Sequence, residues 1–100
     1  MQTVSALRIA ARRDTWGKLI KEKRLNSGLS QGKLATILGY STSQFVSNWE
    51  RGLASPPPKA IPALTASLKL QRSDLESVIT EMNKKVLDIE LVHFLGPVVD

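Results

Sequence analysis

The sequence predicts an all-α protein, a single small domain of five short helices with a C-terminal extension. Apolar residues recur at helical spacing in five segments, and no segment before residue 86 has a convincing strand pattern. Glycine, serine or proline separates each helical segment from the next. A hydrophobic share of 42% in 100 residues is enough for one small core.

The first predicted helix covers residues 16–26, where apolar residues recur at the spacing of one helix face and lysines occupy positions between them. It ends before Gly28, because glycine adopts the left-handed conformation that commonly closes a helix. Residues 1–15 carry three arginines with apolar residues between them. They form either a flexible basic arm or a short extra helix.

The second and third helices are predicted for residues 31–38 and 44–51. Ser30 is positioned to cap the second helix, and Gly39 ends it. The hydroxyl-bearing residues at positions 41–43 offer an N-cap for the third helix, and another glycine follows it.

A fourth helix is expected over residues 58–68. Its first turn should be irregular, or the helix should begin near Pro62, because proline has no N–H for the helical ladder. Ser73 and Glu76 have the spacing of a capping box, which predicts that a fifth helix begins at Asp74.

Charge is unevenly distributed along the chain. Residues 1–72 hold 12 Lys and Arg against three acids, a net charge of +9, whereas residues 73–100 hold two lysines against six acids, a net charge of −4. A basic body attracts a polyanion such as nucleic acid. The sequence has no cysteine and no apolar run long enough to span a membrane, so we expect a cytoplasmic protein.

The pattern of residues 31–52 predicts two helices that cross at a steep angle. Small residues and a glycine lie between them, and each helix has two apolar residues on one face: Leu34 with Leu38, and Val46 with Trp49. Burying those faces turns a polar face of the third helix outward. The outward residues are Gln44, Ser47, Asn48 and Arg51.

This pattern resembles the Cro/CI-type (XRE) helix-turn-helix family of repressors over roughly residues 16–80. The matching motifs are Lys23-Arg24, Gly28-Leu29-Ser30-Gln31, Leu34-Ala35, Gly39 and Trp49-Glu50-Arg51-Gly52. The resemblance implies a five-helix, lambda-repressor-like fold whose third helix reads the major groove of double-stranded DNA. It implies a dimeric transcriptional regulator, most simply a repressor, built from an arm or short helix (1–15), a DNA-binding domain (16–80) and a dimerisation extension (81–100).

One spacing departs from the family. The buried aliphatic residue usually follows the turn glycine by six positions, but Val46 follows Gly39 by seven. Either the turn at residues 40–43 contains one extra residue, or Phe45 takes the buried position and the third helix rotates. An exposed Phe45 could pack on a thymine methyl group.

The resemblance and the side-chain chemistry together nominate contact residues. Glutamine and asparagine amides bind adenine edges as bidentate pairs, and helix N-termini attract phosphates. The expected base contacts are Ser43, Gln44, Ser47 and Asn48. The expected phosphate contacts are Gln31, Lys33, Arg51 and Lys59. The resemblance also implies a structural salt bridge between Arg24 and Glu50, which ties the first helix to the third.

Nothing in the sequence points to an enzyme or to a cofactor. No nucleophile has an adjacent base, no glycine-rich phosphate loop is present, and His93 has no neighbours at metal-ligand spacing. We therefore predict no catalytic residues, no metal and no cofactor.

The C-terminal extension is predicted to make a homodimer. Apolar residues there follow a heptad spacing, and Met82, Val86 and Ile89 would be exposed on a monomer and buried in a dimer. The alternatives are that the tail folds back on its own domain, or that residues 86–95 form a strand. An antitoxin or protein-interaction module that binds a partner through its acidic tail is the alternative function.

Overall fold

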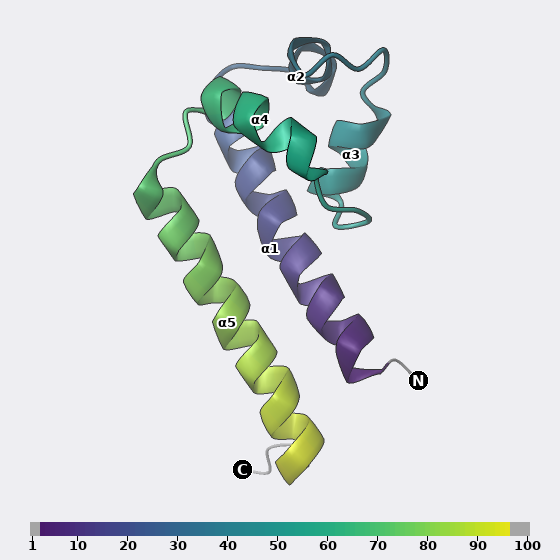
Figure 1. Cartoon of the computed structure of the whole chain (residues 1–100), viewed down its shortest axis with the longest axis vertical. Helices are drawn as coiled ribbons and strands as arrows, with labels where there is room; N and C mark the ends of the chain where they lie inside the picture. The colour runs from purple at the N-terminus through teal and green to yellow at the C-terminus, as the bar shows by residue number, and fades with distance from the viewer. Residues whose placement is uncertain (1–2, 97–100) are drawn as a thin grey trace.

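The computed structural model describes residues 3–96, and all of their regular structure is helical. The helices are α1 (Val4–Asn26), α2 (Gln31–Ile37), α3 (Gln44–Glu50), α4 (Ile61–Leu68) and α5 (Arg72–Leu95), with a 3-10 turn, η1 (Pro58–Ala60), before α4. Helices α2, α3 and α4 gather around one end of α1, while α5 runs along α1 in the opposite direction (Figure 1). This confirms the all-α prediction with five helices.

The core lies where α2, α3 and α4 meet the C-terminal half of α1. Its largest fully buried side chains belong to one aromatic and five aliphatic residues, namely Trp49, Ile20, Leu34, Leu64, Leu68 and Val46. Ala35 is also buried, and its small side chain lets α2 approach the other helices closely. We call this part of the molecule, α2 to α4 with residues 16–26, the head.

Local chemistry accounts for the short helices of the head. The Ser30 hydroxyl accepts a hydrogen bond from the Lys33 amide at 3.0 Å, which caps α2 as predicted. Gly39 has φ of +86°, and the following Tyr40 amide donates to the Ala35 carbonyl at 2.9 Å. A side chain at this φ would be strained, so glycine is the residue that lets α2 end in a tight turn. The irregular first turn expected in the fourth helix is η1, with Pro62 just after it.

Helices α1 and α5 both begin earlier in the chain than the sequence predicts. Residues 4–15 are neither a flexible arm nor a separate short helix, because they continue without interruption into α1. The Thr3 hydroxyl caps α1 by accepting a hydrogen bond from the Ala6 amide. Helix α5 begins at Arg72, before the predicted start at Asp74. Asp74 caps it by accepting a hydrogen bond from the Gln71 amide at 2.9 Å, so the box between Ser73 and Glu76 is not formed.

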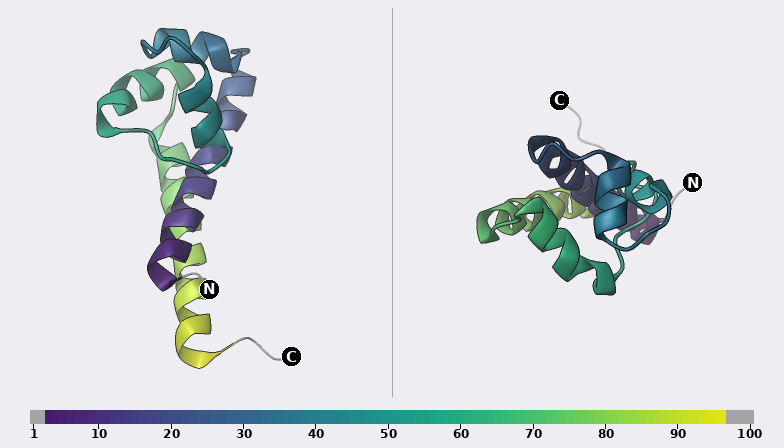
Figure 2. Two further views of the ribbon diagram at one scale, coloured as in Figure 1. Left: turned by 90° about the vertical axis from the view of Figure 1, so that its right-hand side faces the viewer. Right: turned by 90° about the horizontal axis from the view of Figure 1, so that it is seen from above.

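Beyond the head, residues 4–15 of α1 and 78–95 of α5 form a two-helix stalk (Figure 2). Ion pairs join the helices along their length: Lys23 with Asp74, Lys85 with Asp14, and Arg8 with Glu90. The residue number rises in one helix as it falls in the other, as an antiparallel pair requires. The stalk makes the molecule elongated, with extents of 46 × 29 × 24 Å.

The C-terminal extension is helical, so a strand over residues 86–95 is excluded. Val78 is buried against α1, and Met82, Val86 and Ile89 continue its face of α5 and are half-buried. The expectation that these three side chains are exposed on a monomer is therefore wrong. The heptad pattern is real, but α1 of the same chain covers it, as in the fold-back alternative.

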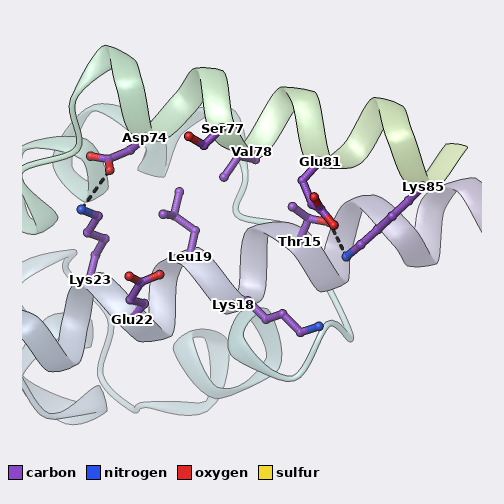
Figure 3. A pocket seen from close by; sticks show the side chains of 10 residues that line it. All are labelled: Thr15, Lys18, Leu19, Glu22, Lys23, Asp74, Ser77, Val78, Glu81 and Lys85. Atoms are coloured by element: carbon purple, nitrogen blue, oxygen red, sulfur yellow. Dashed lines mark hydrogen bonds and ion pairs between the residues drawn. The ribbon is translucent and has the colours of Figure 1, made fainter. Parts of the chain in front are cut away.

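A shallow groove of about 480 Å³ lies between α1 and α5 near the head (Figure 3). Three lysines line it, and each is paired with an acid of the same chain: Lys23 with Asp74, and both Lys18 and Lys85 with Asp14. Glu22 and Glu81 also line the groove, and neither forms an ion pair with a residue of the described chain.

Candidate nucleic-acid interface

The register of α3 is set by its buried side chains. Val46 is completely buried and Trp49 nearly so, while Phe45 keeps 51% of its surface exposed. The two buried residues are three apart and share one face of the helix, so the opposite face points away from the core. The extra residue therefore lies in the turn before α3, and the alternative of a rotated helix is wrong.

Helix α3 also lies on the far side of α1 from α5, so the stalk does not cover its outer face (Figures 1 and 2). Gln44 and Arg51 on this face are exposed, and Ser47 and Asn48 are half-buried. A helix that presents polar side chains without a covering element has the geometry needed to enter the major groove.

Gln44 and Asn48 interact with each other. The Gln44 Nε2 donates a hydrogen bond to the Asn48 Oδ1 at 2.8 Å, one helical turn away. This bond uses one Gln44 N–H and leaves its carbonyl oxygen and second N–H unpaired. Those two groups are the acceptor and the donor that a glutamine needs to bind an adenine edge.

The turn before α3 differs in detail from the sequence prediction. Ser43 makes no capping hydrogen bond with its side chain. Instead, the Thr42 hydroxyl accepts a hydrogen bond from the Gln44 amide at 3.3 Å. Ser43 is half-buried at the start of α3, directly before Gln44.

The four nominated phosphate contacts fall into two groups. Lys33, Arg51 and Lys59 are exposed around the α2–α3 unit, on α2, at the end of α3 and in η1. Gln31 is half-buried in the first turn of α2, and its Nε2 donates to the Glu50 Oε1 at 3.1 Å. Gln31 is thus part of an internal network in addition to lying at a helix N-terminus.

That network centres on Arg24 and Glu50, and the expected salt bridge is present. The Arg24 guanidinium donates from Nε and Nη2 to the two Glu50 carboxylate oxygens, at 2.6 and 2.9 Å. Its Nη1 donates to the Leu29 carbonyl at 2.8 Å. Donating these hydrogen bonds to the Glu50 carboxylate raises the pKa of Arg24. The pair joins the end of α1 to the end of α3 and to the turn before α2.

A second link between α1 and α3 was not foreseen. Gly17 is buried on α1, and a Cβ there would lie 2.3 Å from the Trp49 carbonyl oxygen. The two backbones approach so closely that only glycine fits without a shift. A glycine beside Trp16 inside an otherwise regular helical segment was the signal available in the sequence.

An aromatic hollow beside α3 was also missed. Tyr40, Phe45 and Trp49 line it, and the Tyr40 ring lies 4.8 Å from Phe45 and 5.9 Å from Trp49, measured between centroids. Tyr40 therefore supports the exposed Phe45 ring from the side of the turn.

No three acidic or histidine side chains within residues 3–96 are grouped to hold a metal ion. None of the helices described is long and apolar enough to cross a membrane. Neither finding bears on the outer face of α3, which is polar.

The α2–α3 unit, with the outer face of α3 uncovered, places the protein among helix-turn-helix proteins. A family model described as helix-turn-helix matches residues 20–75, more than half of the chain. The chain therefore belongs to the Cro/CI-type (XRE) helix-turn-helix family, a DNA-binding, transcription-regulating family that is not an enzyme family. No curated protein and no solved structure matches the chain.

Proposed function

We propose that the protein is a sequence-specific transcriptional repressor that binds an operator in double-stranded DNA through the outer face of α3. The observation that carries this proposal is the register of α3. Complete burial of Val46 leaves Gln44, Ser47 and Asn48 on the uncovered side of the helix. Repression follows from occupancy, because a small regulator bound over a promoter blocks access to it.

Gln44 is the principal base reader in this proposal. Its free carbonyl oxygen accepts from adenine N6, and its free N–H donates to N7. Asn48 acts mainly as a positioning residue, because its hydrogen bond at 2.8 Å holds the Gln44 amide in one orientation. Ser43 and Ser47 supply shorter polar contacts on either side, and the exposed Phe45 ring packs on a thymine methyl group.

The cations around α3 supply the sequence-independent part of the affinity. Lys33 and Lys59 contact phosphates through their compact ammonium groups, and Arg51 through its planar guanidinium, which can donate two hydrogen bonds at once. Gln31 contacts a phosphate from the start of α2 while its amide remains linked to Glu50. The Arg24–Glu50 pair contacts no DNA and fixes the angle between α1 and α3.

The test begins with selection of bound fragments from genomic DNA, which identifies a preferred site. Affinity for that site is then measured between 50 and 200 mM salt. If a dimer neutralises about six to ten phosphates, affinity falls by ~10³–10⁵ over this range, because counterions are released on binding. Affinity that stays constant across the range contradicts DNA binding by this surface.

The alternative function is that of an antitoxin or interaction module acting through the acidic C-terminal tail. The observation in its favour is the exposed apolar end of α5. Titration of the full chain against a purified candidate toxin tests this alternative, because an antitoxin forms a complex with its toxin whether or not DNA is present.

A further inference from the structure

The aromatic hollow beside α3 has the size of a small-molecule site. Its volume is about 360 Å³, at the lower end of the range for ligand pockets. The three rings that line it come from the turn before α3 and from α3 itself. The loop after α3 returns beside the helix and supplies further lining through Ala54, Ser55 and Pro57 (Figure 1). A hollow of this volume accommodates one or two fused rings.

The three rings of the hollow are inclined to one another. The Tyr40 ring is tilted by 36° to Phe45 and stands at 72° to Trp49. Trp49 is 2% exposed and closes the bottom of the hollow, whereas Phe45 is 51% exposed and stands at its mouth. Aromatic rings bind one another offset-stacked or edge to face, so walls inclined in this way favour a planar aromatic ligand.

The loop side of the hollow is stiff. Residues 56–58 are three consecutive prolines, and Pro57 is extended, with φ of −68° and ψ of 153°. A proline ring fixes φ, so this wall keeps its shape without a ligand. A ligand that enters a preformed site loses little affinity to ordering the chain.

The charge of the hollow specifies an anion. Among the described residues that line it, Lys59 alone is charged, and the ion pairs of the described chain do not include Lys59. Tyr40 and Ser55 add a hydroxyl group each. One ammonium group balances one negative charge, which is the charge of a carboxylate and not of a phosphate dianion.

We propose that the aromatic hollow binds a small planar aromatic carboxylate, with its ring against Phe45 and Tyr40 and its carboxylate paired with Lys59. Such a ligand and DNA need the same side chains, because Phe45 and Lys59 are also the proposed thymine-methyl and phosphate contacts. The ligand is therefore an effector that releases the protein from its operator by direct competition. This second step rests on the proposed function, whereas binding of the ligand to the hollow does not.

The first test is isothermal titration calorimetry of the full chain without DNA, at neutral pH and low salt. The probe is 2-naphthoate, a planar two-ring carboxylate, and 2-naphthamide is its uncharged counterpart. The wild type is expected to bind one 2-naphthoate per chain with a dissociation constant of about 1 mM or tighter, as a ligand of this size allows. Binding of 2-naphthamide is expected to be about 5–10-fold weaker, because the pair with Lys59 is lost.

Two matched variants locate the probe. Lys59→Gln should weaken 2-naphthoate about 5–10-fold and leave 2-naphthamide unchanged, because only the charged probe uses the ammonium group. Lys21→Gln is the control, since Lys21 is exposed on α1 and does not line the hollow, and it should bind both probes as the wild type does. A wild type that does not bind 2-naphthoate overturns the proposal. Equal affinity of Lys59→Gln and the wild type for 2-naphthoate places the probe elsewhere and also overturns it.

The second test measures competition with DNA. With 2-naphthoate at about nine times its dissociation constant, affinity for the preferred site is expected to fall about tenfold, because the ligand occupies the DNA-free protein. Unchanged affinity for DNA overturns the effector step. A chain that binds 2-naphthoate as expected but selects no DNA site contradicts the proposed function alone, so the two failures are distinguishable.

Discussion

Replacing Glu50 with alanine is predicted to destabilise the fold severely. The Glu50 and Arg24 side chains are 3% and 9% exposed, and three hydrogen bonds hold the guanidinium. Removing the carboxylate leaves a buried cation with only the Leu29 carbonyl as acceptor, and it removes the acceptor of Gln31. Breaking a buried pair in this way costs about 3–5 kcal/mol.

This free energy corresponds to a large shift in melting temperature. Unfolding entropy near the transition is about 2.1 cal/mol/K per residue, or about 0.2 kcal/mol/K for a chain of this length. A loss of about 3–5 kcal/mol therefore lowers the melting temperature by roughly 15–25 °C. Circular dichroism during heating measures this shift directly, and urea unfolding gives the free energy.

Two controls identify the cause. Glu76→Ala removes the acid of an exposed pair with Arg72 and is expected to lower stability by less than about 0.5 kcal/mol. The double variant Arg24→Met/Glu50→Leu removes both charges and should recover most of the lost stability. A melting temperature of Glu50→Ala within about 3 °C of the wild type would refute the reasoning, because it would mean that the pair is solvated.

Three further predictions concern α1, α5 and α3. Gly17→Ala should lower the free energy of unfolding by about 1–3 kcal/mol, because the new methyl group meets the Trp49 carbonyl. Thermal unfolding measures this loss, and an unchanged melting temperature would disprove the close approach of the two backbones. The hydrogen bond from the Gln71 amide and the nearby Lys23 lower the pKa of Asp74 in the folded state. The ionised Asp74 carboxylate therefore stabilises the fold fully above its unfolded pKa of about 3.9, and this contribution is lost as the pH falls below that value. Asp74→Asn should therefore flatten the melting temperature against pH in this acidic range, and a parallel profile would count against the cap. Asn48→Ala should weaken binding to the preferred site by releasing Gln44, whereas equal affinity would show that the bond between them does not orient the reader.

Much of the head could be predicted from the sequence, because its signals are local. Ser30 as a cap and Gly39 as a stop define α2 within a few residues, and they appear in the structure as expected. The identity of the buried residue in α3 could not be decided from spacing alone. It depends on how the turn at residues 40–43 accommodates an extra residue, which is a tertiary property.

The stalk could not be predicted, because its signals belong to two distant segments. Arg8 pairs with Glu90, and Lys85 with Asp14, so neither segment indicates its partner on its own. The heptad pattern in α5 predicted a helix partner correctly but not which one, since α1 of the same chain and α5 of a second chain satisfy the same pattern. The spacing of apolar residues indicates that one face of a helix is covered, but it does not identify the helix that covers it.

The most direct test of the central claim measures how one side chain on α3 changes sequence preference. Affinities of the wild type and of Gln44→Ala are compared on the preferred site and on a set of sites that each differ from it by one base pair. Gln44→Ala is expected to lose about 1–3 kcal/mol on the preferred site and to lose discrimination at one base pair, while Lys59→Ala weakens all sites nearly equally. If Gln44→Ala binds every site as the wild type does, α3 does not read DNA through Gln44 and the account of this interface is contradicted.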